Sequence, residues 1–511
     1  MRVSYGAVSI FSAGMVASSG RLIDNQDAFL HLPPLGHIPM TYRLKPNSED
    51  KSAPASSQKD EKRKKEEPAK TEKALGRLVS LDAFRGFIMV MLAANGFGLY
   101  KLSTTDESSE LWNILNRETF EQIAFHFEHP PWQSCFVPGS TDATVGNAWL
   151  KWKVSFWDLI QPAFMFMVGM AMPFSYARRE SSGQSALTRT IHAFLRAVVL
   201  VLLAVFLYSQ GNDSTNWMFT NVLGQIGLGY FFVYLMLGFP RWAQISAFVV
   251  ILIGTTLAGQ FVPLSQEFVP EEVNASYERG EIFAEPYRQW SKNWNVFHEF
   301  DLWFLNQFPR PERDNPEEIP HRFNRGGYTT LNFVPSMATM LLGVFLGQFV
   351  LIAPRNGKTF LWLLLAALLC TGLGVAAGAT CNPIVKRIWT PAWVLFSGGY
   401  VIGLYALFYL LFDLWPLKKL AFPLVIVGMN SIFVYMVGQL LRSWISREIV
   451  KKHFSFVIDK FFVLVQSVTG SEYSPEQLQE MFAPVTVATS VFLVIWLFCL
   501  WLYRQRIFIR I

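Results

Sequence analysis

Residues 77–99, RLVSLDAFRGFIMVMLAANGFGL, form an apolar block with few charges. A block of this length suits an α-helix that crosses a bilayer, which needs about 20 predominantly apolar residues. The segment before it is strongly basic, because residues 51–77 hold nine Lys or Arg, including the run KDEKRKK at 59–65. Since Lys and Arg collect in cytoplasmic flanks, the stretch predicts a transmembrane helix that begins in the cytoplasm.

The rest of the chain repeats this pattern. Of its 511 residues, 51% are hydrophobic and only 16% are charged, whereas soluble domains carry about 25% charged residues. Because a spanning segment must satisfy its backbone polar groups internally, many separate spans indicate helices. We therefore expect an all-α polytopic membrane protein with about ten transmembrane helices, near residues 79–101, 155–175, 190–210, 218–238, 243–263, 328–352, 359–379, 391–412, 421–440 and 483–503.

The basic residues in the short flanks predict the orientation of these spans. Both termini are expected in the cytoplasm, because the inside loops and the C-terminal tail are basic, with Arg178, Arg179, Arg189, Arg241, Arg355, Lys358, Lys418, Lys419, Arg504, Arg506 and Arg510. Two predicted outside loops break the rule, with Lys386, Arg387, Arg442, Arg447, Lys451 and Lys452. The net charge of +6 then reflects membrane anchoring, and no nucleic-acid binding is expected.

Two regions differ in composition. Residues 1–77 are rich in Pro, Ser and Lys and are predicted to be a flexible, basic cytoplasmic segment. Residues 78–511 are predicted to form the transmembrane domain, with outside loops at 102–153, 264–327 and 441–482. An alternative for residues 1–20 is a cleaved signal peptide, which would conflict with the predicted orientation.

The four cysteines show no metal-ligand spacing, and no metal is expected. Cys135 and Cys381 fall in different outside loops, so they could form a disulfide if that compartment is oxidising.

Three polar residues gather at the outer ends of the first two predicted spans. Asn95 lies toward the outer end of the first span, Asp158 lies at the outer end of the second, and His129 lies between them in the stretch FEHPPWQ. A histidine can take a proton or carry an acyl group near neutral pH, and a carboxylate can orient its ring. A loop histidine is more often solvated than catalytic, so the residues alone leave both interpretations open.

Other polar side chains inside the predicted spans are candidates because they are costly in lipid. Asp82 and Arg85 are three residues apart on one helix face. They could form an interfacial ion pair or be part of a binding site. The further candidates are amides, namely Asn221, Gln225, Asn332 and Asn430. The outside loop 264–327 is rich in Trp and charge, which suits sugar recognition or a packed lid.

Several motifs, taken in order, resemble one known family. RLVSLDAFRGFIMVMLAAN, a His-x-x-Trp loop and WDLIQPAFMFMVGMAMPFS are similar to heparan-alpha-glucosaminide N-acetyltransferase and its bacterial-type homologues. NVLGQIGLGYFFVY, LGVFLGQ and GMNSIFVY extend the resemblance over about residues 78–440. The resemblance implies an integral, multi-pass membrane acyltransferase, in the inner or plasma membrane if bacterial. Such an enzyme moves an acetyl group from cytoplasmic acetyl-CoA to a terminal glucosamine across the bilayer.

The resemblance also implies roles for individual residues. His129 matches the catalytic histidine, whereas His126 lacks a Trp at the matching spacing, and Asn95 and Asp158 match its neighbouring Asn and Asp. The residues expected to bind acetyl-CoA are Arg85, Asp82, Asn221, Gln225, Asn332 and Asn430. Arg178 and Arg179 could hold the CoA phosphates or serve only as topology determinants.

Two motifs depart from the family pattern. The loop reads HPPWQS instead of His-x-x-Trp-x-Gly, and NRGGYTT replaces the usual Asp-Pro-Glu-Gly before the sixth span. Both changes face the predicted acceptor side, so the acceptor could be another amino sugar or glycan.

Three alternatives stay open at this stage. The chain could acylate another cell-envelope acceptor, such as a glycan hydroxyl, or it could transport a small polar solute without acyl transfer. The acetyl group could pass directly to the acceptor or through an acetyl-histidine. The sequence also leaves open whether the protein forms a homodimer.

Overall fold

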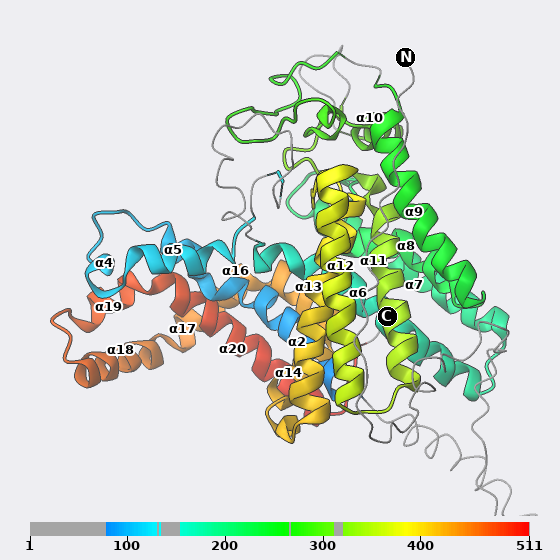
Figure 1. The fold of residues 1–511 in the computed structure, drawn as a ribbon. Coiled ribbons are helices and arrows are strands. Elements are labelled where there is room, and N and C mark those ends of the chain that lie inside the picture. The colour runs from blue at the N-terminus through cyan, green and yellow to red at the C-terminus, as the bar shows by residue number, and fades with distance from the viewer. Residues whose placement is uncertain (1–77, 130–131, 134–153, 265–266, 311–319, 510–511) are drawn as a thin grey trace, which may run out of the picture. The chain divides into compact units, whose positions relative to one another are not determined.

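The computed structural model describes residues 78–129, 132–133, 154–264, 267–310 and 320–509. Helices dominate these residues and no strand occurs among them (Figure 1), which confirms the prediction of an all-α protein. The predictions made for residues 1–77 lie outside the described residues. Cys381 is a free thiol, and its suggested partner Cys135 is not among the described residues, so their pairing stays a prediction.

Seven described helices are long and apolar enough to cross a bilayer. They are α6 (Phe156–Ser181), α7 (Ala186–Ser209), α9 (Arg241–Phe261), α11 (Phe333–Ile352) with its leading turn η6 (Thr330–Asn332), α12 (Gly357–Thr380), α13 (Pro391–Tyr409) with η7 (Leu410–Leu414), and α20 (Ala483–Arg504).

Two further candidate spans are bent. The helix α2 (Val79–Ala93) continues at 44° into η2 (Asn95–Gly98) and α3 (Leu99–Ser103), and α14 (Phe422–Met429) meets α15 (Ser431–Leu440) at 78°. Counting each pair as one span gives up to nine among the described residues.

The remaining predicted span, 218–238, forms α8 (Val222–Met236). A helix of 15 residues rises only about 23 Å, less than the ~30 Å of a hydrocarbon core. Ten spans and cytoplasmic termini therefore stay predictions.

The break in α2 follows from its local sequence. Asn95 and Phe97 have φ angles of 51° and 54°, and Gly96 and Gly98 are also left-handed, so the helix cannot continue through NGFG. A broken helix leaves carbonyl groups without intrahelical partners, and the guanidinium of Arg442 donates a hydrogen bond to the carbonyl of Ala93. Arg442, an exception to the predicted charge bias, thus stabilises the broken end of a span.

The predicted outside loops contain helices that are too short to cross a membrane. These are α4 (Leu111–Ile114), α5 (Arg117–Phe125), η4 (Arg288–Trp290), α10 (Val296–Phe304), η5 (Leu305–Gln307), α16 (Arg442–Trp444), η9 (Ile445–Val450), α17 (Lys451–His453), α18 (Ser455–Thr469) and α19 (Pro475–Met481). The short turn η8 (Leu417–Lys419) lies in a predicted inside loop. Apolar run length cannot detect such elements, because short helices are stabilised mainly by packing.

Hydrogen bonds between helix termini define one end of the bundle. At this end, the side chain of Gln225 in α8 donates to the carbonyls of Thr329 and Thr330 before α11, and Asn382 after α12 donates to Thr256 in α9. We call it the Asp158 end, since α6 begins there. At the opposite end, the Arg179 end, α6 finishes.

Glycines bring α6 and α11 into close contact. A Cβ added at Gly343 would lie 2.0 Å from the carbonyl oxygen of Phe166, and one at Gly169 would lie 1.9 Å from that of Met340. Real Cβ atoms do not approach backbone oxygens so closely, so the two helices would have to separate. Small residues that allow this approach are typical of helix pairs in membranes.

Replacing Gly343 by alanine is expected to destabilise the bundle by about 1–3 kcal/mol, since the new methyl group overlaps the α6 backbone. Gly372→Ala in α12 is the matched control, because a Cβ there meets nothing within 4 Å. Thermal unfolding in detergent should show a lower midpoint for Gly343→Ala and no loss for Gly372→Ala. Equal midpoints for the two variants would contradict the close α6–α11 contact.

Candidate functional site

Three side chains meet around one carboxylate oxygen at the Asp158 end. The Oδ1 atom of Asp158 lies 2.9 Å from Nδ1 of His129 and 2.7 Å from Nζ of Lys386. Nζ of Lys386 is also 3.4 Å from Nδ1 of His129. The side chains of Asp158 and Lys386 are only 6% and 5% exposed, whereas that of His129 is 47% exposed. The cluster is thus a buried ion pair that presents one accessible imidazole.

The first turn of α6 anchors the His129 segment. The hydroxyl of Ser155 accepts the N–H of Trp157 at 3.1 Å and donates to the carbonyl of Glu128 at 2.7 Å. The N–H of Trp157 also donates to the carbonyl of His126 at 3.0 Å. Because these bonds join the residues just before His129 to the residues just before Asp158, they bring the two side chains close together.

An aromatic core in the loop 264–327 packs against the same region. Trp132, Val385 and Ile388 pack in one buried cluster with residues of that loop, namely Phe283, Tyr287, Trp290 and Phe297. The indole N–H of Trp132 donates to the carbonyl of Trp290 at 3.0 Å. Since Trp132 follows His129 by three residues and Val385 precedes Lys386, the core fixes both segments of the cluster. Part of the loop 264–327, from Phe283 to Phe297, is therefore packed against the candidate site.

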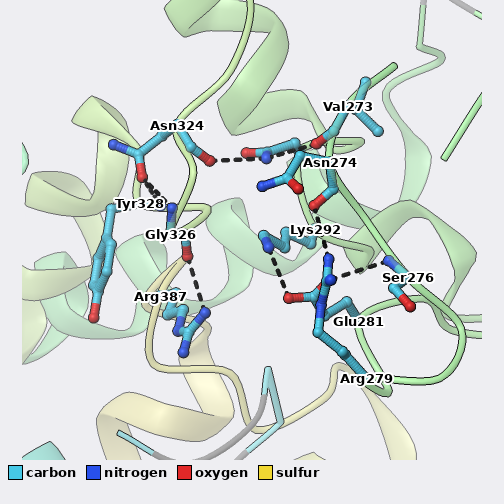
Figure 2. A network of polar contacts seen from close by, with 11 residues as sticks. Val273, Asn274, Ser276, Arg279, Glu281, Lys292, Asn324, Gly326, Tyr328 and Arg387 are labelled. Atoms are coloured by element: carbon cyan, nitrogen blue, oxygen red, sulfur yellow. Dashed lines mark hydrogen bonds and ion pairs between the residues drawn. The ribbon is translucent and has the colours of Figure 1, made fainter. Parts of the chain in front are cut away.

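A polar network stabilises this loop (Figure 2). The carboxylate of Glu281 accepts from the buried ammonium of Lys292 at 2.7 Å and from Arg279 at 2.8 Å. The amide of Asn293 bridges to the carbonyl of Asn324. The guanidinium of Arg387 donates to the carbonyl of Gly326 at 3.2 Å. Arg387, the neighbour of Lys386, thus ties the loop to the start of α13.

Lys386 is charged at neutral pH despite its burial. Burial alone would lower the pKa of its ammonium, but the phenol of Tyr328 and the carboxylate of Asp158 hold that pKa above its ordinary value. A buried ion pair of this kind is retained only when both partners are in place, because either one alone is left uncompensated.

Asn95 lies near this cluster but does not join it. The neighbouring Gly96 packs so closely on the ring of Phe127 that a Cβ there would lie 2.6 Å from it. Phe127 precedes His129 by two residues. Among the hydrogen bonds of the described residues, none links the Asn95 side chain to His129 or Asp158.

The four predicted cofactor-binding amides bond to backbone groups. Asn221 caps α8 through the N–H of Gly224, and Gln225 donates to three carbonyls at the Asp158 end. Asn332 donates to the carbonyl of Arg387. Asn430, at the bend between α14 and α15, accepts the N–H of Ile509 at 2.8 Å. These contacts favour a role of the four amides in connecting helices over a role in binding a ligand. Their predicted cofactor role stays a prediction.

Asp82 and Arg85 form the predicted i, i+3 ion pair, at 2.7 Å. The guanidinium of Arg85 also donates to the carbonyl of Gly428 in α14. Arg85 lines a cavity of about 120 Å³ between α2, α6, α7, α8 and α15, whereas Asp82 does not. The lining of this inner cavity runs along α8 from Tyr230 to Val222, toward the Asp158 end.

A second cavity of about 220 Å³ adjoins the first, and both are lined by Met172, Ser175, Arg196 and Tyr230. Its remaining lining combines basic and aromatic side chains, Arg179, Arg189, His192, Tyr176 and Tyr234, with the aliphatic side chains of Ala193, Leu195 and Val199. The two cavities together lead from the Arg179 end into the bundle.

The arginines of the outer cavity have hydrogen-bonding capacity left over. Arg189 stacks on Tyr176 and pairs with Glu180 at 3.4 Å, and Arg196 stacks on Tyr230. The buried Nε atoms of Arg189 and Arg196 have no hydrogen-bond partner within the described chain. Buried donors are normally satisfied, so these nitrogens fit an anionic ligand. No cluster of metal-ligating side chains occurs in the described ranges.

Sequence reasoning missed Lys386, Arg189 and Arg196 as site residues. In the sequence, Lys386 stood out only as a basic residue in a predicted outside loop, where few Lys or Arg are expected. That unusual position was the available indication of a specific role. Arg189, His192 and Arg196 recur at helical spacing in α7, so they could have been recognised as one basic helix face.

Asp301 of α10 supports the start of α11. Its Oδ2 atom accepts the N–H of Thr330 at 2.9 Å, and burial raises its pKa to about 7. Because folding disfavours the ionised form, the folded state loses stability as the pH rises from the ordinary Asp range through about 7.

Asp301→Asn keeps a carbonyl acceptor for Thr330 and cannot ionise. The midpoint of thermal unfolding of this variant, relative to that of the unmodified protein, is expected to rise by a few degrees between pH 4.5 and pH 8. A difference in midpoint that stays constant over this range would contradict the ionisation of Asp301 in the folded protein.

One comparison with known families finds a match to part of the chain. Residues 140–273 match the family model described as heparan-alpha-glucosaminide N-acetyltransferase, catalytic. This stretch covers less than half of the chain; it contains Asp158 and the outer cavity, and it begins after Asn95 and His129. No curated protein matches the chain. The match confirms the resemblance predicted from the motifs: residues 140–273 are similar to the catalytic region of the heparan-alpha-glucosaminide N-acetyltransferase family.

Proposed function

We propose that this membrane acetyltransferase moves an acetyl group from cytoplasmic acetyl-CoA to an amino sugar or another glycan acceptor on the opposite side of the bilayer. The observation that carries the proposal is the hydrogen bond between His129 and Asp158 at one end of a bundle whose other end opens into a basic cavity. Acetyl-CoA is multiply charged and cannot cross lipid, so donor and acceptor must approach such a site from opposite ends.

The outer cavity suits the phosphate groups of the donor. Arg179, Arg189 and Arg196 supply positive charge there, and the unpaired nitrogens of Arg189 and Arg196 can donate charge-assisted hydrogen bonds. The inner cavity is mainly apolar, with Met89, Phe164 and other side chains of α2, α6 and α8. An apolar passage fits the uncharged pantetheine arm, which would carry the thioester toward the Asp158 end.

His129 is our candidate for the catalytic base. Its Nδ1–H would donate to Asp158, which leaves Nε2 free to take a proton from the acceptor amine or hydroxyl as that atom attacks the thioester carbonyl. The C–S bond then breaks, and the imidazolium returns the proton to the departing thiolate. The products are the acetylated acceptor and CoA. Asn95 is a candidate donor to the oxyanion, because it lies in the break of α2 beside Gly96, which packs on Phe127.

His129→Ala is expected to lower acetyl transfer at least about 100-fold, the usual contribution of a general base. The assay uses purified protein, labelled acetyl-CoA and a panel of amino sugars and glycan hydroxyls. The matched control is His126→Ala, since His126 is exposed and only its backbone carbonyl serves the site. Transfer that survives His129→Ala would refute this role, and absence of any interaction with acetyl-CoA would favour a solute transporter.

The same preparation separates direct transfer from an acetyl-histidine. Rapid quenching without acceptor traps label on His129 if the acetyl group is first carried by its imidazole. Absence of label there, with transfer intact when acceptor is added, indicates direct attack.

Arg196→Gln is expected to raise the KM for acetyl-CoA about tenfold with little change in kcat, because a phosphate contact acts equally in the ground state and the transition state. Arg178→Gln is the control, since Arg178 is exposed and does not line the cavity. Equal KM values for the two variants would place the donor phosphates elsewhere.

A further inference from the structure

Lys386 is the one member of the buried cluster that the proposed mechanism does not yet use. We propose that Lys386 is a positioning residue: its ammonium keeps Asp158 ionised, so that the carboxylate holds the proton of His129 on Nδ1 and leaves Nε2 free. This inference rests on the proposed role of His129. Lys386 itself stays protonated and exchanges no atom with the substrates.

The shared oxygen atom carries the geometric argument. Oδ1 of Asp158 is the nearest partner of both Nζ of Lys386, at 2.7 Å, and Nδ1 of His129, at 2.9 Å. An ionised carboxylate has acceptors only, so the 2.9 Å contact of Oδ1 with Nδ1 requires the ring proton on Nδ1, with the carboxylate as its acceptor. If the carboxyl group were protonated, it would donate to Nδ1 instead, and the ring proton would move to Nε2. To act as a base through Nε2, the ring needs its proton on Nδ1 and none on Nε2.

Burial shows why the carboxylate needs a cation. The side chain of Asp158 is 6% exposed, and a buried carboxylate without a partner tends to take up a proton. The ammonium of Lys386 is the closest positive charge to it. Among the described residues, the other titratable or charged groups around the pair include Tyr328 before α11, Arg387 beside Lys386, and Glu128 beside His129.

The segment between α12 and α13 fixes Lys386 in place. Val385 and Ile388 on either side are fully buried with Trp132. The N–H of Val385 donates to the hydroxyl of Thr390 at 3.1 Å, and the indole of Trp389 donates to Thr339 in α11. These contacts leave the lysine stem little freedom, so its ammonium is directed at Asp158 rather than at solvent.

A spectroscopic test does not depend on knowing the acceptor. In ¹⁵N-histidine-labelled protein in lipid, the His129 resonances are identified by difference against His129→Gln. The unmodified protein should show a protonated Nδ1 and a bare Nε2 at the pH where the ring is neutral. Lys386→Met should shift the neutral ring toward the Nε2–H tautomer, and Lys386→Arg should restore the original pattern.

The control is Lys292→Met, which breaks another buried lysine pair, at Glu281, with no hydrogen bond to His129 or Asp158 in the described residues. This variant can lower stability but should leave the His129 resonances unchanged. If Lys386→Met also leaves them unchanged, the proposal is wrong, whatever the protein's substrate. A correct tautomer shift in a protein that transfers no acetyl group would sink the proposed function and leave the positioning role standing.

Kinetics give the second readout. Lys386→Met should lower kcat at least about 100-fold with KM for acetyl-CoA nearly unchanged, and the acidic limb of its pH–rate profile should move. Lys386→Arg should recover most of kcat and the original limb. A profile of unmodified shape in Lys386→Met, or a loss no greater than that of Lys292→Met at equal amounts of folded protein, would overturn the proposal.

Discussion

The arrangement of the candidate site depends on one buried carboxylate oxygen. Oδ1 of Asp158 accepts from both His129 and Lys386, which come from segments far apart in the chain. A buried carboxylate is tolerated only with such partners. The beginning of α6, the His129 segment and the α12–α13 segment must therefore be in contact in the folded protein. The cap at Ser155 and the aromatic core around Trp132 have the same effect, since each holds one of these segments against another.

The basic residues that violate the charge bias illustrate the same constraint. Lys386 pairs with Asp158, Arg387 donates to Gly326, and Arg442 donates to the broken end of α2 at Ala93. The excess of Lys and Arg in cytoplasmic loops concerns side chains that only orient the spans. Lys386, Arg387 and Arg442 instead have specific partners inside the folded chain. An exception to the bias was therefore informative about the site, although the sequence did not identify the partner.

Local sequence patterns predicted those features of the fold that depend on residues close together in the chain. Apolar runs identified the long helices, and the placement of Asn95, His129 and Asp158 near the outer ends of two spans anticipated the observed His129–Asp158 contact. The sequence could not predict the pairing of Asp158 with Lys386, because 228 positions separate them and a spatial contact leaves no local pattern.

The intramembrane amides have backbone partners that the sequence did not predict. Gln225 and Asn430 were expected at a ligand because polar groups are costly in lipid, yet their side chains bond to backbone groups of neighbouring segments. A span that is short, such as α8, or bent, such as α14 with α15, leaves backbone groups that need such partners. Because a polar side chain in a span is costly, it is expected to have a hydrogen-bond partner. That partner is a ligand only in some cases.

The central claim is that donor and acceptor reach one site from opposite ends of the bundle. Sealed proteoliposomes with uniform protein orientation test it most directly, with labelled acetyl-CoA supplied on one face and an amino-sugar acceptor on the other. The account predicts acetylated acceptor only when acetyl-CoA faces the Arg179 end and the acceptor faces the Asp158 end. Product that forms only when both substrates share one face would contradict it.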